Sequence, residues 1–224
     1  MMASPSDLED FAVGFAFTER IVEDLDQIID IAVEEDERGI LLNVEVSRER
    51  EPVVLNRVRH RASESSCGLC GIENLDQALR PLPRVGIPPE VDRKLLFEAL
   101  ERIREHQQLN ADTGAVHGAA YFASDGSLVS VREDVGRHNA FDKLIGDALR
   151  SGRFLGDGFV VLTSRCSYEL VEKAALAGVS LLLTVSAPTT LAVERAREAG
   201  LTLVALARSD SMLVISDPHM RFPA

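Results

Sequence analysis

The sequence predicts an α/β fold whose central sheet is parallel and covered by helices. Two apolar segments, "GFVVLTS" (158–164) and "VSLLLTVS" (179–186), each lead directly into an amphipathic helical pattern, and a third, "LTLVALA" (201–207), follows the second helix. Strands and helices that alternate at this spacing are typical of parallel sheets. Strands buried on both faces have continuous apolar sequences of this kind. The later segment "MLVIS" predicts one more strand, at the edge.

The first 80 residues predict a smaller α+β part. Apolar residues recur at helical spacing over 8–16, and Ser6 with Glu9 matches a capping box. The segment "IIDIAVEEDERGILLNVEVS" predicts a β-hairpin that turns at "DERG". The polar, glycine-rich segment "RVRHRASESSCGLCG" predicts a loop. The prolines of "RPLPRVGIPPE" predict a linker, so we place a domain boundary between residues 1–80 and 81–224.

The region between the linker and the first buried strand predicts two helices that flank a β-hairpin. "PEVDRKLLFEALERIREHQQL" is amphipathic, with Pro88 and Pro89 at its start. "GAVHGAAYFASDGSLVSVRED" predicts two strands that turn at the Asp-Gly pair. An apolar stripe across 141–149 then predicts a helix.

The two helices between the buried strands have identifiable ends. "SYELVEKAALAG" is expected to stop at Gly178, because glycine favours the left-handed conformation that ends helices. "APTTLAVERAREAG" is expected to hold Pro188 in its first turn and to stop at Gly200.

Charge and composition reduce the range of functions that the sequence allows. The net charge of −12 disfavours a general binder of nucleic acid or of anionic membranes, since such proteins present a basic face. The sequence has no apolar run of about 20 residues and no signal-peptide pattern. Three cysteines, two of them close together, fit a reducing compartment better than a disulfide framework. We therefore expect a cytoplasmic protein with no nucleic-acid or membrane partner.

Cys67 and Cys70 form a C-x-x-C motif in "CGLCG", and four roles are open for them. A structural zinc site usually has four ligands, so it would have to recruit the distant His60, His117 or His138. A redox pair would open a helix, and the glycine that follows each cysteine disfavours that geometry. The third role is a reactive thiol on a flexible arm, and the fourth is a bystander loop.

A basic stretch upstream bears on the third role. It comprises Arg57, Arg59, His60 and Arg61, within ten residues of Cys67. If these side chains fold near the loop, their charge would favour the thiolate, which is the reactive form of cysteine.

A second candidate site lies in "REDVGRHNAFDKLIG" (132–146). Arg137 and His138 open a helix, and the free backbone N–H groups there, together with Arg137, can hold an anionic group. Glu133 and Asp134 can accept hydrogen bonds from a base or a pterin ring. The alternative is a glycine turn before a capped surface helix.

The third candidate site is the row of strand ends. In a parallel sheet the carboxyl ends of the strands line a ligand crevice, and hydroxyls with one guanidinium would suit a phosphate or pyrophosphate there. The residues concerned are Thr163, Ser164, Arg165, Ser186, Thr189 and Thr190. The alternative is helix capping by Ser167 and Ser186. We interpret His117 as a satisfied core histidine.

Five segments together identify a family. They are "CGLCG", "TGAVHGAAYF", "EDVGRHNAFDKLIG", "SRCSYELVEKAALAGV" and "VSAPTTLAVERAREAGLTLVALAR". The sequence that contains them resembles the formate dehydrogenase accessory sulfurtransferases, the FdhD family, from about Asp7 to about Ser216. The resemblance implies a cytidine-deaminase-like α/β domain with a smaller N-terminal part, in a cytoplasmic homodimer.

The resemblance also implies an activity. Family members accept persulfide sulfur from a cysteine desulfurase and pass it to the molybdenum (or tungsten) bis(guanine dinucleotide) cofactor, which formate dehydrogenase requires in sulfurated form. Carried over, Cys67 is the persulfide site and Cys70 assists it. GDP is expected to mimic this cofactor. The expected cofactor-binding residues are Leu206, Ala207, Arg208, Ser209, Asp210 and Ser211, with Arg137, His138, Arg165, Ser186 and Thr189.

This chain departs from the family pattern at three places. Family members usually carry strands before the helix that begins near Leu8, so we expect a shortened N-terminal part. Asp210 and Ser211 stand where a glycine and a basic residue are usual, and Asp210 would repel a pyrophosphate. Cys166 occupies a turn where the family commonly has a small residue.

Three functions follow as hypotheses. The first is a sulfurtransferase that uses Cys67. The second is a non-catalytic chaperone that holds the molybdenum cofactor while formate dehydrogenase matures. The third is a cofactor-binding remnant. A zinc-dependent deaminase is excluded, because the sequence has no H-x-E motif and Ser66, not proline, precedes Cys67.

Overall fold

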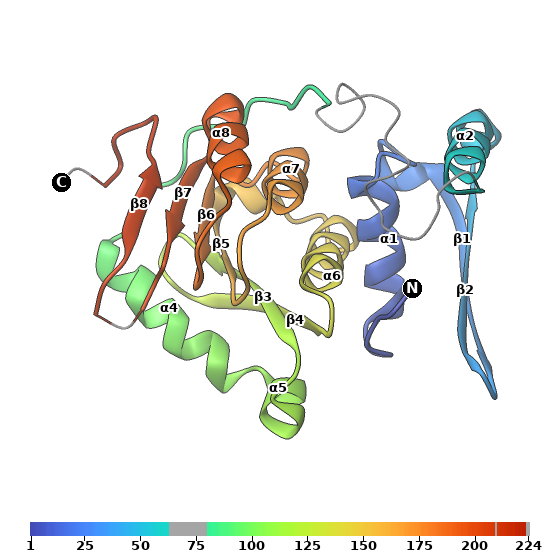
Figure 1. The fold of residues 1–224 in the computed structure, drawn as a ribbon, viewed down its shortest axis with the longest axis horizontal. Coiled ribbons are helices and arrows are strands. Elements are labelled where there is room, and N and C mark those ends of the chain that lie inside the picture. Colours follow the sequence, from blue (N-terminus) through green and yellow to red (C-terminus); the bar gives the residue numbers. More distant parts are fainter. Residues whose placement is uncertain (63–79, 209, 223–224) are drawn as a thin grey trace.

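A six-stranded mixed sheet forms the centre of the computed structural model, which describes residues 1–62, 80–208 and 210–222 (Figure 1). In spatial order the strands are β4 (Leu128–Asp134), β3 (His117–Ala123), β5 (Gly158–Leu162), β6 (Leu181–Thr184), β7 (Thr202–Ala205) and β8 (Leu213–Ser216). Parallel pairing joins β5 to β6 and β6 to β7, which confirms the predicted parallel core. The hairpin β3–β4 and the edge strand β8 are also confirmed, and they pair antiparallel.

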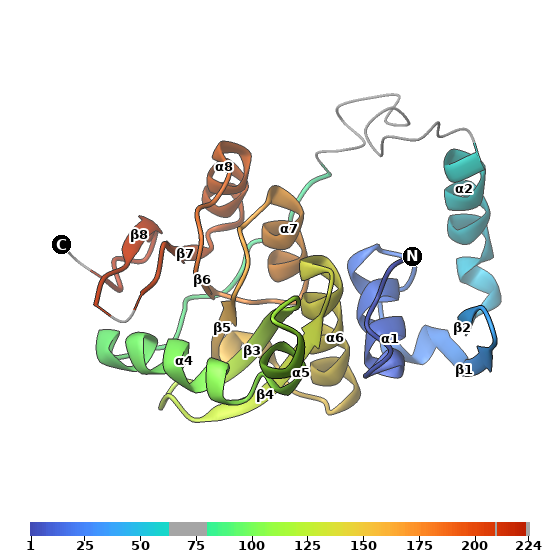
Figure 2. The ribbon, with the colours of Figure 1, turned by 60° about the horizontal axis from the view of Figure 1, so that its bottom comes forward.

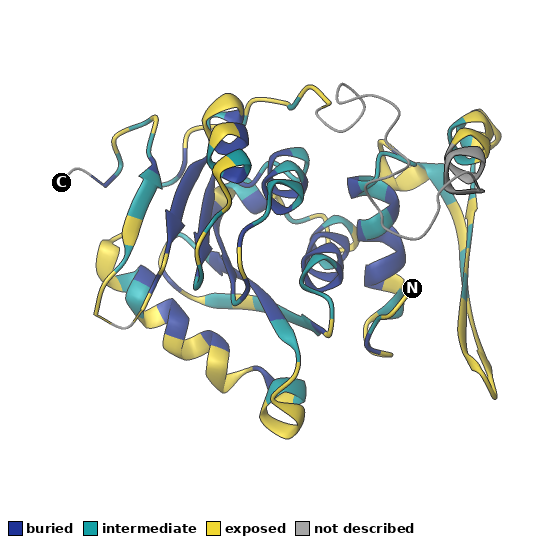
Figure 3. Cartoon of the chain, in the orientation of Figure 1, coloured by how far each residue is buried: buried dark blue, intermediate teal, exposed yellow. Residues whose placement is uncertain are grey.

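Helices cover both faces of this sheet, as expected for an α/β fold. The helices α6 (Arg137–Arg150), α7 (Tyr168–Leu176) and α8 (Thr190–Ala199) lie on one face, and α4 (Arg93–Glu105) lies on the other. Alternate residues of β5 enter the two cores, with Leu162 on the α6 side and Val161 on the α4 side. Because β5, β6 and β7 are buried throughout, their sequences are continuous apolar runs (Figure 3).

The N-terminal residues form α1 (Leu8–Thr18), the hairpin of β1 (Ile28–Asp36) and β2 (Gly39–Val46), and α2 (Glu51–Ala62). The hairpin was predicted correctly, and it stands away from the central sheet with α2 beside it (Figure 2). A short helix α5 (Gln108–Thr113) follows α4, and 3-10 turns occupy Leu25–Gln27, Arg48–Arg50 and Leu155–Asp157.

Helix α1 packs directly on α6 through two glycines. A Cβ atom at Gly14 would overlap the carbonyl oxygen of Asp142, and one at Gly146 would overlap that of Asp10. The two helix backbones are therefore in contact, which only glycine permits at these positions. Beside this crossing, the buried Lys173 Nζ donates to Asp142 Oδ1 at 2.8 Å and to Thr18 Oγ1 at 2.8 Å.

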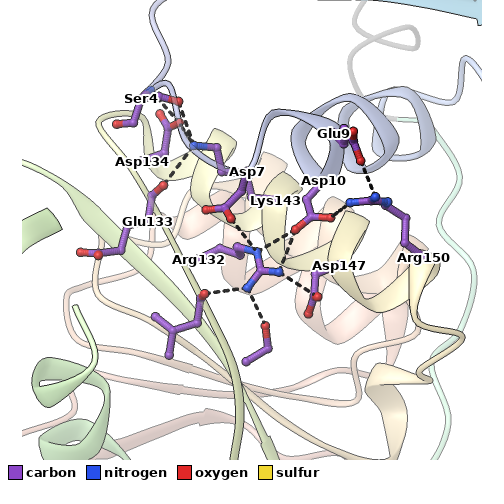
Figure 4. Close-up of polar contacts among 12 residues, drawn as sticks. Ser4, Asp7, Glu9, Asp10, Arg132, Glu133, Asp134, Lys143, Asp147 and Arg150 are labelled. Atoms are coloured by element: carbon purple, nitrogen blue, oxygen red, sulfur yellow. Dashed lines mark hydrogen bonds and ion pairs between the residues drawn. The ribbon is translucent and has the colours of Figure 1, made fainter. Parts of the chain in front are cut away.

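Ion pairs also tie the N-terminal segment to β4 and α6 (Figure 4). Arg132 donates from Nε to Asp10 Oδ2 at 2.8 Å and from Nη2 to Asp147 Oδ1 at 2.8 Å. Arg150 pairs with Glu9 and Asp10. These contacts fix α1 against the edge of the sheet that β4 forms.

A second, fully buried ion pair lies at the start of α6. Lys143 Nζ lies 2.7 Å from Asp134 Oδ2, and both side chains have an exposed fraction of 0%. Asp134 also accepts hydrogen bonds from the backbone N–H groups of Ser4 and Gly136 and from Asn139 Nδ2. The pair thus holds both the N-terminal segment and the turn before α6.

Several predicted boundaries were wrong. The N-cap of α1 is Asp7, in the left-handed conformation with φ 52° and without a side-chain cap, rather than Ser6. Residues 57–62 continue α2 instead of beginning a loop, while 63–79 lie outside the described residues. Helix α4 begins at Arg93, because Asp92 caps it by accepting from Lys94 N, and Pro188 precedes α8 rather than entering it.

Among the described residues, no helix is both long enough and apolar enough to cross a membrane. The boundary placed between residues 1–80 and 81–224 stays a prediction, and α1 on one side of it packs against α6 on the other.

Candidate functional site

The ends of four central strands lie side by side and are joined by backbone hydrogen bonds. Thr163 N, after β5, donates to Gly118 O in β3, and Val185 N, after β6, donates to Leu162 O. Ala207 N, after β7, donates to Thr184 O. We call residues 163–167, 185–189 and 206–211, with the adjoining 117–118 and 136–138, the strand-end region. The structure thus brings together the second and third candidate sites.

Arg137 and Arg165 both lie near enough to His117 for their charges to act on it. The pKa of His117 is lowered first by its burial and then by the positive charges of these two arginines. The Nε atom of Arg137 is buried and has no hydrogen-bond partner in the part of the chain that the structure describes. Arg165 is exposed. Two guanidinium groups with an unsatisfied donor are suited to an anionic ligand.

His138 lies on the other side of the start of α6, facing α7. Its Nε2 atom is 3.2 Å from Ser167 Oγ and 3.9 Å from Glu169 Oε2. Burial, and then the charge of Arg137, lower the pKa of His138 to about 4. The imidazole is therefore neutral at pH 7 and can donate one hydrogen bond and accept another.

The hydroxyl groups predicted at the strand ends have different roles. Thr189 caps α8, since its Oγ1 accepts from Ala192 N at 3.2 Å. Ser186 does not cap a helix as the alternative proposed; its carbonyl oxygen accepts from Leu206 N. Ser167 occupies the N-cap position of α7 but makes no capping bond through its side chain.

Two acidic groups proposed to contact a ring are already engaged. Glu133 accepts hydrogen bonds from the backbone N–H groups of Leu109 and Asn110, at 2.8 and 2.9 Å. Asp134 is held in the buried pair with Lys143. Both carboxylates are thus hydrogen-bonded within the protein: Asp134 holds the turn before α6, and Glu133 holds the start of α5. Their predicted contact with a ring stays a prediction.

Residues 206–208 follow β7, and residues 210 and 211 precede β8. Leu206 is exposed and adopts a left-handed conformation with φ 52°. Ala207 is buried, and Arg208 is exposed and donates its N–H to Ser211 O at 2.8 Å. Ser211 Oγ donates to the side chain of Asp210, and Ser209 lies outside the described residues. The stretch is joined to β6 but carries both a cation and an anion on its surface.

Of the cysteines, the structure describes Cys166 alone. Cys67 and Cys70 lie outside the described residues, as do the side chains of 57–61, so their predicted role stays a prediction. Cys166 has an exposed fraction of 0%, and burial raises its pKa to about 12. Its thiol is therefore a packing group rather than a nucleophile.

A cavity of about 410 Å³ opens next to the strand-end region, under α4 and α5. We call it the α4–α5 cavity. His117, Thr163 and Val185 line it from the sheet, and Gln107 and Asn110 line it from the helices. His117 is half-buried, and its imidazole makes no hydrogen bond within the described residues, so the prediction of a satisfied core histidine was wrong. Sequence reasoning missed both amides, because neither belongs to a motif.

The described residues contain no group of three or more histidine, cysteine, aspartate and glutamate side chains placed as metal ligands. Their polar groups at the strand ends are guanidinium, imidazole, hydroxyl and backbone N–H, together with the carboxylate of Asp210. That set of donors is suited to phosphate oxygens and to ring heteroatoms.

Comparisons with known proteins bear on this arrangement. The model of the FdhD/NarQ family matches residues 1–221. Sulfur carrier protein FdhD from Xanthomonas euvesicatoria pv. vesicatoria is 44% identical over 219 residues, covering 98% of this chain and 78% of that protein. The protein of the same name from Agrobacterium fabrum is 42% identical over 217 residues, covering 96% of this chain and 80% of its own.

A solved structure agrees with these relatives. The crystal structure described as a formate dehydrogenase accessory protein from Desulfotalea psychrophila superposes with a TM-score of 0.71 at 25% identity, covering 97% of this chain and 80% of that one. Sequence and fold therefore agree over almost all of the chain. This protein belongs to the FdhD/NarQ family.

Proposed function

We propose that this protein is a sulfur carrier that serves the maturation of formate dehydrogenase. One observation above all supports the proposal: the charges of Arg137 and Arg165 both act on His117 at the strand ends, in a chain whose 44% identical relative is named a sulfur carrier protein. Transfer of sulfur to a phosphorylated cofactor requires a region that binds anions and a reactive thiol.

The first half of the reaction is acceptance of sulfur at Cys67, assisted by Cys70. The Cys67 thiolate attacks the terminal sulfur of a persulfide on a cysteine desulfurase; a new S–S bond forms at Cys67, the donor S–S bond breaks, and the donor leaves as a thiolate. Cys166 is unsuited to this step, because its thiol is buried and stays protonated.

The second half is delivery to the molybdenum bis(guanine dinucleotide) cofactor, the substrate that receives the sulfur. Arg137 and Arg165 would hold its phosphates, and the stretch 206–211 would contact it across the end of β6. The unsatisfied Nε of Arg137 fits this role. The proposal includes a cytoplasmic homodimer, with formate dehydrogenase as the recipient.

The test of the first half is mass spectrometry after incubation with a cysteine desulfurase and cysteine, without reductant. We expect the wild type to gain one sulfur on the peptide that holds Cys67, and dithiothreitol to remove it. Cys67→Ala should abolish the gain, while the control Cys166→Ala should keep it. Undiminished loading of Cys67→Ala would refute the assignment.

The test of the second half is GDP binding measured by calorimetry. Arg137→Gln should weaken binding at least about tenfold, the loss expected for one charge-assisted phosphate contact. The matched control is Arg197→Gln, an exposed arginine in the last turn of α8, away from the strand ends. If a Cys67→Ala/Cys70→Ala variant still matures formate dehydrogenase, the protein is a cofactor-holding chaperone instead.

A further inference from the structure

Three arginine side chains meet where the described chain resumes at residue 80, at the start of the linker (residues 80–90). Arg20 Nη2 donates to Pro81 O at 2.9 Å, and Arg195 Nη2 donates to Arg80 O. One guanidinium group from the turn after α1 and one from α8 thus hold consecutive carbonyl groups of the linker. The side chain of Arg80 itself is the third cation at this place.

The carboxylates nearby are engaged by one of these three cations. Arg195 is buried and pairs with Glu172 at 2.7 Å and with Glu198 at 2.5 Å. Arg80 is exposed, and its guanidinium makes no hydrogen bond or ion pair within the described residues. Its charge acts on the half-buried Arg20, whose pKa is lowered first by burial and then by Arg80. Two like charges therefore lie together, while Glu172, which also acts on Arg20, is bound by Arg195.

Arg20 also occupies a backbone position that favours glycine. It follows Glu19, the C-cap of α1, and has φ 58°, in the left-handed region that bulky side chains rarely adopt. At the end of α8 a glycine, Gly200, adopts this conformation with φ 72°. The strained backbone at Arg20 places a guanidinium beside Arg80, where a glycine would leave no charge.

We propose that Arg20 and Arg80 bind a carboxylate-rich segment of the protein that donates sulfur to this one. Guanidinium groups form bidentate pairs with carboxylates, so two of them without a bound carboxylate favour an acidic partner. The whole chain has a net charge of −12, so the pair is a local basic surface on an acidic protein, and a second copy of the chain would be repelled.

The position of the pair favours the donor over the recipient of the sulfur. Arg80 is the described residue that directly follows 63–79, the segment that contains Cys67, and it is 13 residues along the chain from that cysteine (67 to 80). The residues expected to bind the cofactor lie instead in the strand-end region. The inference rests on the proposed function, under which the donor is a cysteine desulfurase.

Two variants, Arg20→Gln and Arg80→Gln, test the proposal by removing one charge each. The matched control is Arg84→Gln, an exposed arginine of the same linker whose charge is not among those that act on Arg20. Each protein is loaded either by a cysteine desulfurase with cysteine or by inorganic polysulfide, which has no protein surface to dock. The readout is the rate of sulfur gain on the Cys67 peptide by mass spectrometry, with circular dichroism to verify folding.

Both variants should load at least about fivefold more slowly at subsaturating desulfurase, with an unchanged maximal rate, because a lost charge at a contact surface slows association. About 0.5 M sodium chloride should slow the wild type towards the variants, since salt screens exposed charges. A hexaglutamate peptide should inhibit desulfurase-dependent loading of the wild type and not of the variants. Loading by polysulfide should stay within about twofold, and Arg84→Gln should match the wild type throughout.

Different failures have different meanings. Unchanged desulfurase-dependent loading of both variants would remove the donor from this surface and leave the proposed function standing, even if maturation of formate dehydrogenase were lost. Equal slowing with polysulfide would show that the arginines act on the Cys67 thiol, and equal slowing of Arg84→Gln would show an effect of net charge; either result overturns the inference. A wild type that gains no sulfur from the desulfurase would overturn both this inference and the first half of the proposed function.

Discussion

The buried pair of Lys143 and Asp134 gives the sharpest test of how this fold is held together. In Lys143→Met the aliphatic part of the side chain is retained and the charge is lost. The Asp134 carboxylate keeps its bonds to Ser4, Gly136 and Asn139 but loses its counter-charge, 2.7 Å away. Lys143 also donates to the carbonyl oxygens of Ser4 and Glu133, which would lose those donors.

The expected cost is large because both side chains are wholly inaccessible to water. Removing one partner of a buried ion pair typically costs about 3–5 kcal/mol, since the remaining charge stays buried without compensation. The free energy of unfolding of a domain is about 5–15 kcal/mol in total. Lys143→Met should therefore lose a substantial part of the stability of the whole fold.

Urea denaturation followed by circular dichroism measures this loss. The control is Lys94→Met, whose side chain is 80% exposed and pairs with Glu98 at the surface; it should change the free energy of unfolding by less than about 1 kcal/mol. Asp134→Asn combined with Lys143→Met should recover part of the loss, because no unpaired charge is then buried. A single Lys143→Met variant as stable as the Lys94→Met control would refute the reasoning.

Three further predictions concern other parts of the fold. Gly14→Ala should destabilise the protein by about 3 kcal/mol or more in urea denaturation, because the new methyl group meets the backbone of α6. The control Gly86→Ala should be nearly neutral, because its methyl group meets nothing within 4 Å. Equal stabilities of the two variants would contradict this prediction. Iodoacetamide at pH 8 should leave Cys166 unlabelled in the native protein and label it in urea, as peptide mass spectrometry would show, since its pKa is about 12 in the fold. The folded pKa of His138, about 4, lies below its unfolded value of 6.5, so the unfolded chain binds the proton first and stability falls as pH drops from 6.5 towards 4. The melting temperature of His138→Gln should fall less than that of the wild type between pH 7 and pH 5, and an equal fall would exclude this contribution.

The sequence predicted the parts of the fold whose signals are local. Continuous apolar runs identified β5, β6 and β7, and an Asp-Gly turn identified the hairpin β3–β4. Helix α2 was assigned in part to a loop, because its polar surface gives no apolar stripe to recognise. The start of α4 was misplaced because proline competes with aspartate as a start signal, and here the side-chain cap of Asp92 decides the boundary.

The contacts that position the candidate site depend on residues far apart in the sequence. Arg165 was expected at the strand ends from the order of the strands, which is a property of topology. Arg137 was assigned to a separate site at the start of a helix, and only the family resemblance placed both residues in one site. The engagement of Asp134 by Lys143 and of Glu133 by α5 was not predicted, because a charged residue gives no local sign of a buried partner. Gly14 and Gly146 likewise have no local signal, since each is required by the backbone of the other helix.

The contacts of Ser4 with Asp134 and Lys143 affect the order in which parts of the chain fold during synthesis. Ser4 is synthesised before its partners Asp134 and Lys143, which follow 130 and 139 residues later. Helix α1 likewise has to wait for α6 before its glycine face is covered. On the ribosome α1 is therefore made well before the helix that it packs on, and it docks only after α6 has been translated. Until then its apolar residues Phe11 and Val13, buried in the finished fold, lack their native cover.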